Sequence, residues 1–449
     1  MEFKISKEFL SQIEGYISEN NEKELESLFQ DIHTADIAEI MCELDDTEAA
    51  YIFNLLETER TSEILLELDE EVREKILSNL SAKEIAEEID ELDTDDAADI
   101  IAELSQSKKE EVISELEDVE HAKDIVDLLR YDEDTAGGLM GKELVKVNEN
   151  WSVLTCVKEM RLQAENVTRV YSIYVVDDEN RLKGRLSLKD LLTTSTKTQI
   201  AEIYIKKVTY VNVDAQDVEV ARIMQKYDLE AIPVVDDMGR LVGRITIDDI
   251  IDVIKDEADK DYQMAAGISQ DVEADDSVWQ HTKARLPWLI IGMLIELLAS
   301  QVLKHNQVTS EKFFTLIIFM PLLSATAGNI GVQASAIIVQ GLANGTLKGF
   351  SRNYFSKEIT VAMISGTIIS LLVLGYHTMM YGQFRVGLAI SISIVAVILF
   401  AATLGTLVPL FLHKKKIDPA IATGPFITTS NDVFGIIIYF TVAKLILGF

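Results

Sequence analysis

Five long apolar stretches fill the C-terminal third of this 449-residue sequence, at about 287–303, 313–342, 358–381, 385–412 and 419–447. Backbone N–H and C=O groups find no water in lipid, so a chain crosses a membrane only as helices or as a closed barrel. Each stretch is long enough, or nearly long enough, to cross as a helix. An unbroken succession of such stretches is hard to bury in a soluble domain. We therefore predict a transmembrane domain of five helices at residues 285–449.

The direction of insertion follows from the charges between the stretches. The sequence starts MEFKISKEFLSQIEGY, without the apolar core of a signal peptide, so we expect the N-terminus in the cytoplasm. Eight basic residues then lie on the cytoplasmic side and three outside, which satisfies the positive-inside rule. The eight are Lys283, Arg285, Lys348, Arg352, Lys357 and Lys414–Lys416, and the three are Lys304, Lys312 and Arg385. The C-terminus of this multi-pass protein of the cell (inner) membrane is expected to be extracellular or periplasmic.

The first 130 residues carry most of the negative charge of the chain. They hold 40 acidic and 11 basic residues, out of a net charge of −34 for the whole sequence. Such a balance disfavours nucleic acid as a partner, because binding to phosphates requires clustered Lys and Arg. Two readings of the carboxylates remain open: a solvated outer face, or a surface that binds cations to relieve its own repulsion.

The acidic block is also an internal repeat. Leucine recurs every twelve residues, at Leu44, Leu56, Leu68, Leu80, Leu92, Leu104, Leu116 and Leu128, and isoleucine precedes it by four at Ile40, Ile52, Ile64, Ile76 and Ile100. A spacing of four is helical, and polar junctions such as LSAKEIA can cap the next helix. We predict an all-α acidic helical-repeat domain at 1–130, with short helices stacked as a curved solenoid.

A second repeat occupies the middle of the chain. The segment VVDDENRLKGRLSLKDLL at 175–192 returns as VVDDMGRLVGRITIDDII at 234–251, with nine identities in eighteen positions. Each copy predicts a strand, a turn, a second strand and a helix, in an α/β unit. These residues resemble a pair of CBS domains, over 137–258. The resemblance implies contacts with an adenine nucleotide such as ATP through Ser187 with Asp190 and through Thr246 with Asp249, although a Ser or Thr followed by Asp three residues later is also an ordinary helix N-cap.

An acidic segment joins this repeat to the apolar stretches. Asp249, Asp252, Asp256 and Asp259 are spaced three, four and three residues apart, which aligns them along one face of a helix. Like charges at this spacing weaken an isolated helix. A divalent cation or a basic partner would relieve the repulsion. We predict an acidic connecting helix at 247–284 that links the soluble domains to the membrane domain.

Polar residues inside the apolar stretches indicate function, because they are costly in lipid. Asp432 lies near the middle of the last stretch, with Thr428 one turn earlier on the same helical face. An ionised carboxylate at that depth costs about 2.5–3.5 kcal/mol on insertion scales, so a cation or a water-filled path is expected beside it. In the second stretch, the side chains expected on one pore-lining face are Thr326, Asn329 and Gln333.

Glu296 in the first stretch is also near mid-membrane. The sequence offers two readings for it: a place along a pore, or a protonated side chain in helix packing. Nothing in the sequence aligns it with a partner.

The expected ligands favour one kind of ion. Potassium filters use a carbonyl-lined loop of the TVGYG type, which this sequence lacks. Calcium prefers several carboxylates, whereas magnesium usually keeps its waters and touches one or two carboxylates. One aspartate per chain with neighbouring hydroxyl and amide groups suits hydrated Mg²⁺. Manganese and cobalt would accept the same ligands.

The order of acidic repeat, CBS pair, acidic connector and five apolar stretches, with PLLSATAGNIGVQAS at 321–335 and DPAIATGPFITTSNDVFG at 418–435, resembles the MgtE family of magnesium channels and transporters. The resemblance covers essentially the whole chain. It implies a homodimer with a pore on the two-fold axis, where Asp432 holds hydrated Mg²⁺. It also implies that cytosolic Mg²⁺ closes the pore through Asp95, Asp99, Asp228, Asp249, Asp252, Glu257 and Asp261. Lys260 and Val332 depart from the residues of some relatives, which affects the expected number of regulatory ions and the pore coordination.

The expected function is Mg²⁺ influx across the cell membrane, closed by cytosolic Mg²⁺. Two alternatives share the soluble features: a CBS-regulated transporter of another divalent cation such as Co²⁺, and a Mg²⁺ sensor that transports nothing. An enzyme is not expected, because the apolar stretches contain no HExxH zinc motif and hold His377 as their one histidine.

Overall fold

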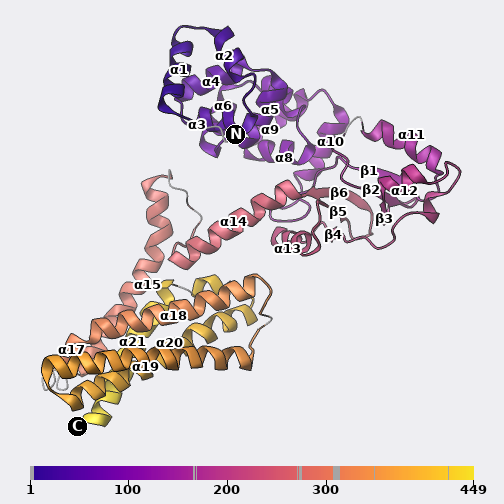
Figure 1. Cartoon of the computed structure of the whole chain (residues 1–449). Helices are drawn as coiled ribbons and strands as arrows, with labels where there is room; N and C mark the ends of the chain where they lie inside the picture. The colour runs from indigo at the N-terminus through magenta and orange to yellow at the C-terminus, as the bar shows by residue number, and fades with distance from the viewer. Residues whose placement is uncertain are drawn as a thin grey trace. The chain divides into compact units, whose positions relative to one another are not determined.

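The computed structural model describes residues 5–164, 167, 169–270, 272, 276–306, 314–347, 349–422 and 424–448. Its chain divides into two compact units, Met1–Ile254 and Lys255–Phe449. The first unit holds the acidic repeat and the α/β repeat, and the second holds the long apolar helices (Figure 1). Lys312 and Lys348, two of the basic residues counted for the positive-inside rule, lie outside the described residues.

The acidic block is all helical in its described part, as its twelve-residue period predicts. Its helices are α1 (Lys7–Ser18), α2 (Glu22–Phe29), α3 (Thr34–Cys42), α4 (Asp46–Leu55), α5 (Thr58–Glu67), α6 (Glu70–Asn79), α7 (Ala82–Ile89), α8 (Thr94–Glu103), α9 (Gln106–Glu115) and α10 (Val119–Leu128). The repeat isoleucines are buried. Several repeat leucines, such as Leu56 and Leu104, have extended backbone at the C-caps of their helices. One repeat is therefore a helix of nearly three turns and a two-residue junction.

Several of the few cations of this block bind carbonyl groups at the ends of helices. Arg60 donates to the carbonyls of Phe29 and Ile32, and Lys108 donates to those of Leu77 and Leu80. Arg73 donates to two carbonyls as well, and it pairs with Glu103 at 2.5 Å. The last carbonyls of a helix have no partner within it, so cations there are stabilising. Most carboxylates are consequently left to solvent.

The α/β repeat forms two three-stranded sheets of identical topology. The first is β1 (Val145–Asn148), β2 (Ile173–Val176) and β3 (Leu182–Leu186), and the second is β4 (Val211–Asn212), β5 (Ala231–Val235) and β6 (Leu241–Thr246). In each, the first pair is parallel and the second antiparallel. The register shifts between Val175 and Val176 and again between Val234 and Val235, at equivalent positions of the two copies. This shared irregularity confirms that the copies are one structural unit repeated.

Short helices complete the copies, and the turns join them. The helices are α11 (Val153–Gln163), α12 (Leu188–Thr193), a 3₁₀ turn at Ile200–Glu202 and α13 (Asp217–Tyr227). The N–H of Leu182 donates to the carbonyl of Gly239, and the N–H of Leu241 donates to that of Asn180. The hairpin turn of each copy thus pairs with the other copy, which closes the two into one body.

The acidic connector is shorter than the sequence predicted. Its helix, α14, spans Ile247–Ala266, and the next helix begins only at Val278, so the predicted helix over 247–284 is wrong in its second half. Gly267 ends α14 with φ +85°. The N–H of Gly267 donates to the carbonyl of Met264 and the N–H of Ile268 to that of Gln263. This pair of bonds is a Schellman cap, which requires a left-handed residue and is best served by glycine.

The second unit contains five helices, among its described residues, that are long and apolar enough to cross a membrane. They are α15 (Val278–His305), α17 with α18 (Phe314–Ile318 and Met320–Ala343), α19 (Arg352–Tyr381), α20 (Phe384–Lys414) and α21 (Gly424–Leu447), with a 3₁₀ turn at Pro419–Ala422 before α21 (Figure 1). The five predicted stretches match these helices to within a few residues, apart from α15 and α19, which start earlier. The five predicted helices are present, and each is long and apolar enough to cross a membrane.

Helix α20 is the centre of this unit, and glycine allows its neighbours to approach. A Cβ at Gly405 of α20 would collide with the carbonyl oxygen of Gly331 on α18. A Cβ at Gly331 would in turn lie 2.5 Å from the Asn431 amide nitrogen and 2.6 Å from the Ile427 side chain on α21. Small residues at such crossings permit close packing of helices in lipid. They fix α21, which carries Asp432, against α18 and α20.

Candidate metal centres

The first candidate centre joins the start of α8 to the start of α14, both in the first unit. Loss of hydration, followed by the charges of Asp249 and other acids, raises the pKa of Asp95 well above its ordinary value. The same two causes raise the pKa of Asp96 to about 7. For Asp99, loss of hydration and the charges of Glu133 and Asp249 raise the pKa to about 7. Loss of hydration is also the main cause that raises the pKa of Asp249 to about 6.

A tighter group of carboxylates lies at the same place. One oxygen from each of Asp93, Asp95 and Glu143 lies within 4.8 Å of the other two. Glu143 also accepts bonds of 3.0 Å from the N–H and from the hydroxyl of Thr94, so it caps the N-terminus of α8 from a distant segment. A Cβ at Gly141 would lie 2.7 Å from the Asp95 carboxylate, so a glycine here lets the backbone pass close to the acids.

One cation partly balances this group. The Arg244 guanidinium is nearly buried and lies 3.4 Å from the carboxylate of Asp93, and its Nε donates to the backbone carbonyl of Glu143. Arg244 also stacks over the ring of Tyr171. A single guanidinium leaves several acids around Asp95 uncompensated. Carboxylate oxygens gathered in this way are the ligands that Mg²⁺ and Ca²⁺ prefer.

Asp249 also caps the helix that carries it. It lies in the first turn of α14, and its carboxylate accepts from both the N–H and the hydroxyl of Thr246, at 3.2 and 2.9 Å. These bonds cap the helix and fix the carboxylate toward α8. Sequence reasoning named Asp95, Asp99 and Asp249, and the structure brings these three together.

The remaining predicted regulatory residues are not part of this centre. Asp228 is exposed at the C-cap of α13 with φ +50°. Asp252 is exposed on α14, and Glu257 lies 4.0 Å from Lys260 as a surface pair. In the described part of one chain, Asp228 and Asp252 join no group of acids that could hold an ion, whereas the charge of Glu257 acts on Asp261.

A second candidate centre lies in the second unit, where α14 ends. Loss of hydration and then the charges of Asp418 and Glu257 raise the pKa of Asp261 to about 6, although Lys260 opposes them. Asp418 precedes α21, and the chain at the two places is in contact. A Cβ at Gly267 would lie 2.5 Å from the ring of Pro425, the second residue of α21. The end of the connector therefore rests against the start of the helix that carries Asp432.

Asp432 itself is half-buried on α21, and its neighbour is Glu296 of α15. The two carboxyl groups lie within hydrogen-bonding reach of each other. A Cβ at Gly292, one turn before Glu296, would lie 3.7 Å from the side chain of Thr429, which lies three residues before Asp432. The contact of Gly292 with Thr429 and that of Glu296 with Asp432 follow the same order along both helices, so α15 and α21 run parallel here. The carboxyl pair is therefore part of the packing between these two helices.

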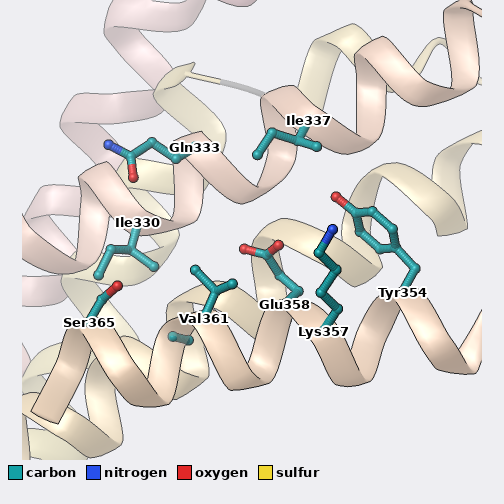
Figure 2. A pocket seen from close by; sticks show the side chains of 9 residues that line it. Ile330, Gln333, Ile337, Tyr354, Lys357, Glu358, Val361 and Ser365 are labelled. Carbon is teal, nitrogen blue, oxygen red and sulfur yellow. The ribbon is translucent and has the colours of Figure 1, made fainter.

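The predicted pore-lining residues occupy different positions around Asp432. Thr428 packs 3.4 Å from the position of a Cβ at Gly328, and its hydroxyl donates to the carbonyls of Gly424 and Pro425, which leaves the oxygen free to accept. Thr326 is half-buried and donates to Leu322, and Asn329 is exposed. Gln333 lines a cavity of about 260 Å³ between α18 and α19 (Figure 2). Among the described residues no hydrogen bond joins Thr326, Asn329 or Gln333 to Asp432.

The two copies of the expected nucleotide motif differ. Thr246 and Asp249 are hydrogen-bonded to each other and belong to the first centre. Ser187 caps α12 without a side-chain bond, and neither Ser187 nor Asp190 makes a side-chain hydrogen bond in the described part of the chain. The first copy therefore keeps its polar groups available, and the second does not.

Sequence reasoning missed Asp93, Asp96 and Glu143 of the first centre and Asp418 of the second. Asp93 and Asp96 stand within the LDTDDAAD segment that supplied Asp95 and Asp99, so the signal for them was present. Glu143 and Asp418 stand alone in loops, and only the folded chain places them beside other acids.

Comparison with known proteins relates all parts of the chain to one family. A family model described as "Divalent cation transporter" matches residues 320–442, and one described as "MgtE intracellular N domain" matches 32–134. The CBS-domain model matches twice, at 136–196 and 200–256. The predicted CBS pair is confirmed.

Individual relatives agree with the family models. The chain is 36% identical to the magnesium transporter MgtE of Thermus thermophilus over 73% of its own length and 75% of that protein. It is 33% identical to the magnesium transporter MgtE of Enterococcus faecalis, over 74% and 73% of the two lengths. A crystal structure of the cytosolic domain of the Mg²⁺ channel MgtE in complex with ATP covers 54% of this chain and 99% of its own, with 35% identity and a TM-score of 0.51.

These matches extend over both units and include the segment that carries Asp432. A family of transporters also confirms the expectation that the chain is not an enzyme. The chain belongs to the MgtE family of divalent cation transporters.

Proposed function

We propose that this protein is a magnesium channel or transporter that admits Mg²⁺ across the cell membrane and closes when cytosolic Mg²⁺ rises. The observation that carries the proposal is the position of Asp432 on α21, inside a helix apolar and long enough to cross the bilayer. A carboxylate at that depth is costly unless it meets a cation or water. The similarity to magnesium transporters named MgtE supports Mg²⁺ as that cation.

The groups around Asp432 suit an ion that keeps its water. Waters bound to Mg²⁺ are strong hydrogen-bond donors, so they require acceptors. The carboxylate of Asp432, the hydroxyl oxygen of Thr428 and the carboxylate of Glu296 are acceptors on two packed helices. A hydrated ion would lose little hydration energy here, which suits an ion that dehydrates reluctantly. Thr326, Asn329 and Gln333 are proposed to line the path on α18.

The regulatory ions are proposed to bind at the two soluble centres. Asp95, Asp99 and Asp249 would be bridged by one cation or more, with Asp93 and Glu143 beside them. Asp261 and Asp418 would be bridged by another. Helix α14 begins at the first centre and ends against Pro425 at the second. Ions at both ends would hold this helix in one position against the start of α21, and thereby close the path past Asp432.

The ion must bind the closed state more tightly for this mechanism to work, because equal affinity for both states shifts nothing. Without ions, the crowded carboxylates repel one another and favour separation of α8 from α14. With ions, the same charges become ligands. The repulsion in the open state and the coordination in the closed state supply the required difference in ion affinity between the two states.

A homodimer with its pore on the two-fold axis is proposed for the working form. Asp228 and Asp252 lie apart from both centres within one chain, so a role as ligands would require the second protomer, whereas the charge of Glu257 acts on Asp261 in the second centre. The soluble domains are proposed to lie in the cytoplasm, with the C-terminus on the extracellular or periplasmic side.

An adenine nucleotide is proposed to bind the first CBS copy. The crystal structure of a related cytosolic domain contains ATP. Ser187 and Asp190 have free polar groups, whereas Thr246 and Asp249 bond to each other. The nucleotide would therefore contact Ser187 and Asp190, and Asp249 would serve the cation centre.

Uptake of Mg²⁺ by proteoliposomes tests the proposed function. We expect uptake by the wild-type protein and its loss in Asp432→Ala, while Asp134→Ala, an exposed acid outside both centres, leaves it unchanged. Uptake of Co²⁺ with exclusion of Mg²⁺ would favour the alternative of another divalent cation. Absence of any flux from correctly folded protein would favour a sensor without transport.

A further inference from the structure

The cavity between α18 and α19 shares Gln333 with the proposed transport path, but its other lining residues have no role in that path. Its volume is about 260 Å³, and its walls include Ile330, Ile337, Val361 and Ala362 (Figure 2). This volume is slightly below the range of about 300–1,000 Å³ typical of whole small-molecule sites. It suits one portion of a longer, mainly apolar molecule.

The depth of the cavity matches one leaflet of a bilayer. Along α19 the lining runs from Tyr354 to Ser365, which is about 16 Å at 1.5 Å per residue. An apolar core of about 30 Å centred on this 30-residue helix leaves roughly five residues outside it at each end. Tyr354 then lies at headgroup level, Lys357 at the boundary, and Ser365 close to mid-bilayer. An amphipathic molecule that enters from the surface would fill the cavity along its length.

Two opposite charges stand at the mouth of the cavity. Lys357 and Glu358 both line it, and Figure 2 shows their side chains extending from α19 toward α18. In the described part of the chain neither makes a hydrogen bond or an ion pair, although the charge of Lys357 acts on its neighbour. Lysine can extend its ammonium toward the membrane surface, but the shorter glutamate cannot. The half-buried carboxylate of Glu358 therefore requires a cationic donor at its own depth.

We propose that this cavity binds a phospholipid whose headgroup carries a primary ammonium, as in phosphatidylethanolamine. The lipid phosphate pairs with Lys357, and the ammonium, two carbons away, pairs with Glu358. One acyl chain fills the apolar space between Ile330, Ile337 and Val361. Basic pockets between membrane helices bind lipid headgroups, and the adjacent acid selects a zwitterion over an anionic lipid.

Native mass spectrometry of the full-length protein tests this inference. The protein is mixed with equal amounts of phosphatidylethanolamine, phosphatidylcholine and phosphatidylglycerol that carry the same acyl chains. We expect phosphatidylethanolamine to be retained roughly tenfold over phosphatidylcholine, because a quaternary ammonium donates no hydrogen bond to Glu358. Stepwise N-methylation of the headgroup should reduce retention by the wild-type protein step by step, and this series depends on no variant.

Variants locate the site. Glu358→Gln should abolish the preference for phosphatidylethanolamine, and Ser365→Phe should weaken the retention of all three lipids by filling the deep end of the cavity. Arg352→Gln and Thr367→Phe are matched controls outside the lining, and they should behave as wild type. Equal retention of the three lipids by the wild type would overturn the proposal. So would a preference for phosphatidylethanolamine that survives Glu358→Gln. A shift from dimer to monomer in Ser365→Phe with lipid retention unchanged would also overturn it, because it would assign the cavity to a protein interface.

Discussion

At the scale of single residues, the same carboxyl group has different roles that the sequence does not distinguish. Most acids of the first 130 residues face solvent. Glu88 is instead nearly buried and accepts bonds of 2.9 and 2.7 Å from the hydroxyl of Thr61. Asp95 faces other acids, and Glu296 reaches Asp432. These differences come from contacts between residues far apart in the chain.

Glu88 makes the stability of the acidic repeat depend on pH. Burial raises the pKa of Glu88 from its ordinary value of 4.5 to about 7, although the Thr61 hydroxyl opposes the shift. A carboxyl whose pKa is raised on folding stabilises the fold below pH 4.5, and this contribution is lost as pH rises through 7. Its loss amounts to about 3 kcal/mol at most. Glu88→Gln should remove the dependence and stabilise the repeat at pH 8.

The pH dependence due to Glu88 can be measured by hydrogen exchange of α5 and α7 in the full-length protein. The exchange rates are corrected for the intrinsic effect of pH. Glu91→Gln, an exposed neighbour, is the control and should keep the wild-type profile. A wild-type profile in Glu88→Gln would contradict the assignment.

Glu296 should strengthen the binding of the transported ion. The carboxyl group of Glu296 lies beside Asp432, and in its ionised form one unit charge at about 4 Å from the ion contributes about 1 kcal/mol even in water. Glu296→Gln should therefore raise the Mg²⁺ concentration for half-maximal uptake about fivefold. Ser300→Ala, one turn further along α15, should leave it unchanged. An unchanged value in Glu296→Gln would assign Glu296 to helix packing alone.

At the scale of elements, the periodic patterns of the sequence predicted which helices are present but did not predict where α14 ends. The twelve-residue leucine period and the five apolar stretches predicted helices because each signal is local and repeated. The end of α14 depends on one glycine, Gly267. The helical spacing of the acids before it favoured a longer helix in the prediction. The first centre depends on Glu143, about fifty residues after α8 starts, so no local pattern predicts it.

Gly267 should be intolerant of a side chain for two separate reasons. Its φ of +85° strains any other residue, and a Cβ would collide with Pro425. Gly267→Ala should therefore loosen the junction of α14 and α21, by more than the roughly 1 kcal/mol of backbone strain. Gly345→Ala, with φ +64° and open space around it, carries the strain alone. Hydrogen exchange near residues 261–268 measures the effect of Gly267→Ala, and hydrogen exchange near residues 341–347 measures the effect of Gly345→Ala. Equal effects would show that the contact with Pro425 contributes nothing.

At the scale of the whole molecule, the soluble acids and Asp432 are proposed to act in one circuit. Neutralising Asp249, Asp252 and Glu257 together should leave the channel open at high cytosolic Mg²⁺, because the ion then lacks ligands that favour the closed state. The control neutralises Glu110, Glu111 and Glu115, three exposed acids of α9, and changes net charge equally. Closure of the first variant at the wild-type Mg²⁺ concentration would reject this gating model.

One molecule is proposed both to conduct Mg²⁺ and to be closed by it. Patch-clamp recording of the wild-type protein tests both halves, with Mg²⁺ as the charge carrier and cytosolic Mg²⁺ raised in steps. We expect an inward Mg²⁺ current at low cytosolic Mg²⁺ that disappears as the concentration rises, and no current in Asp432→Ala under any condition. A current that persists at high cytosolic Mg²⁺, or one that survives Asp432→Ala, would contradict it.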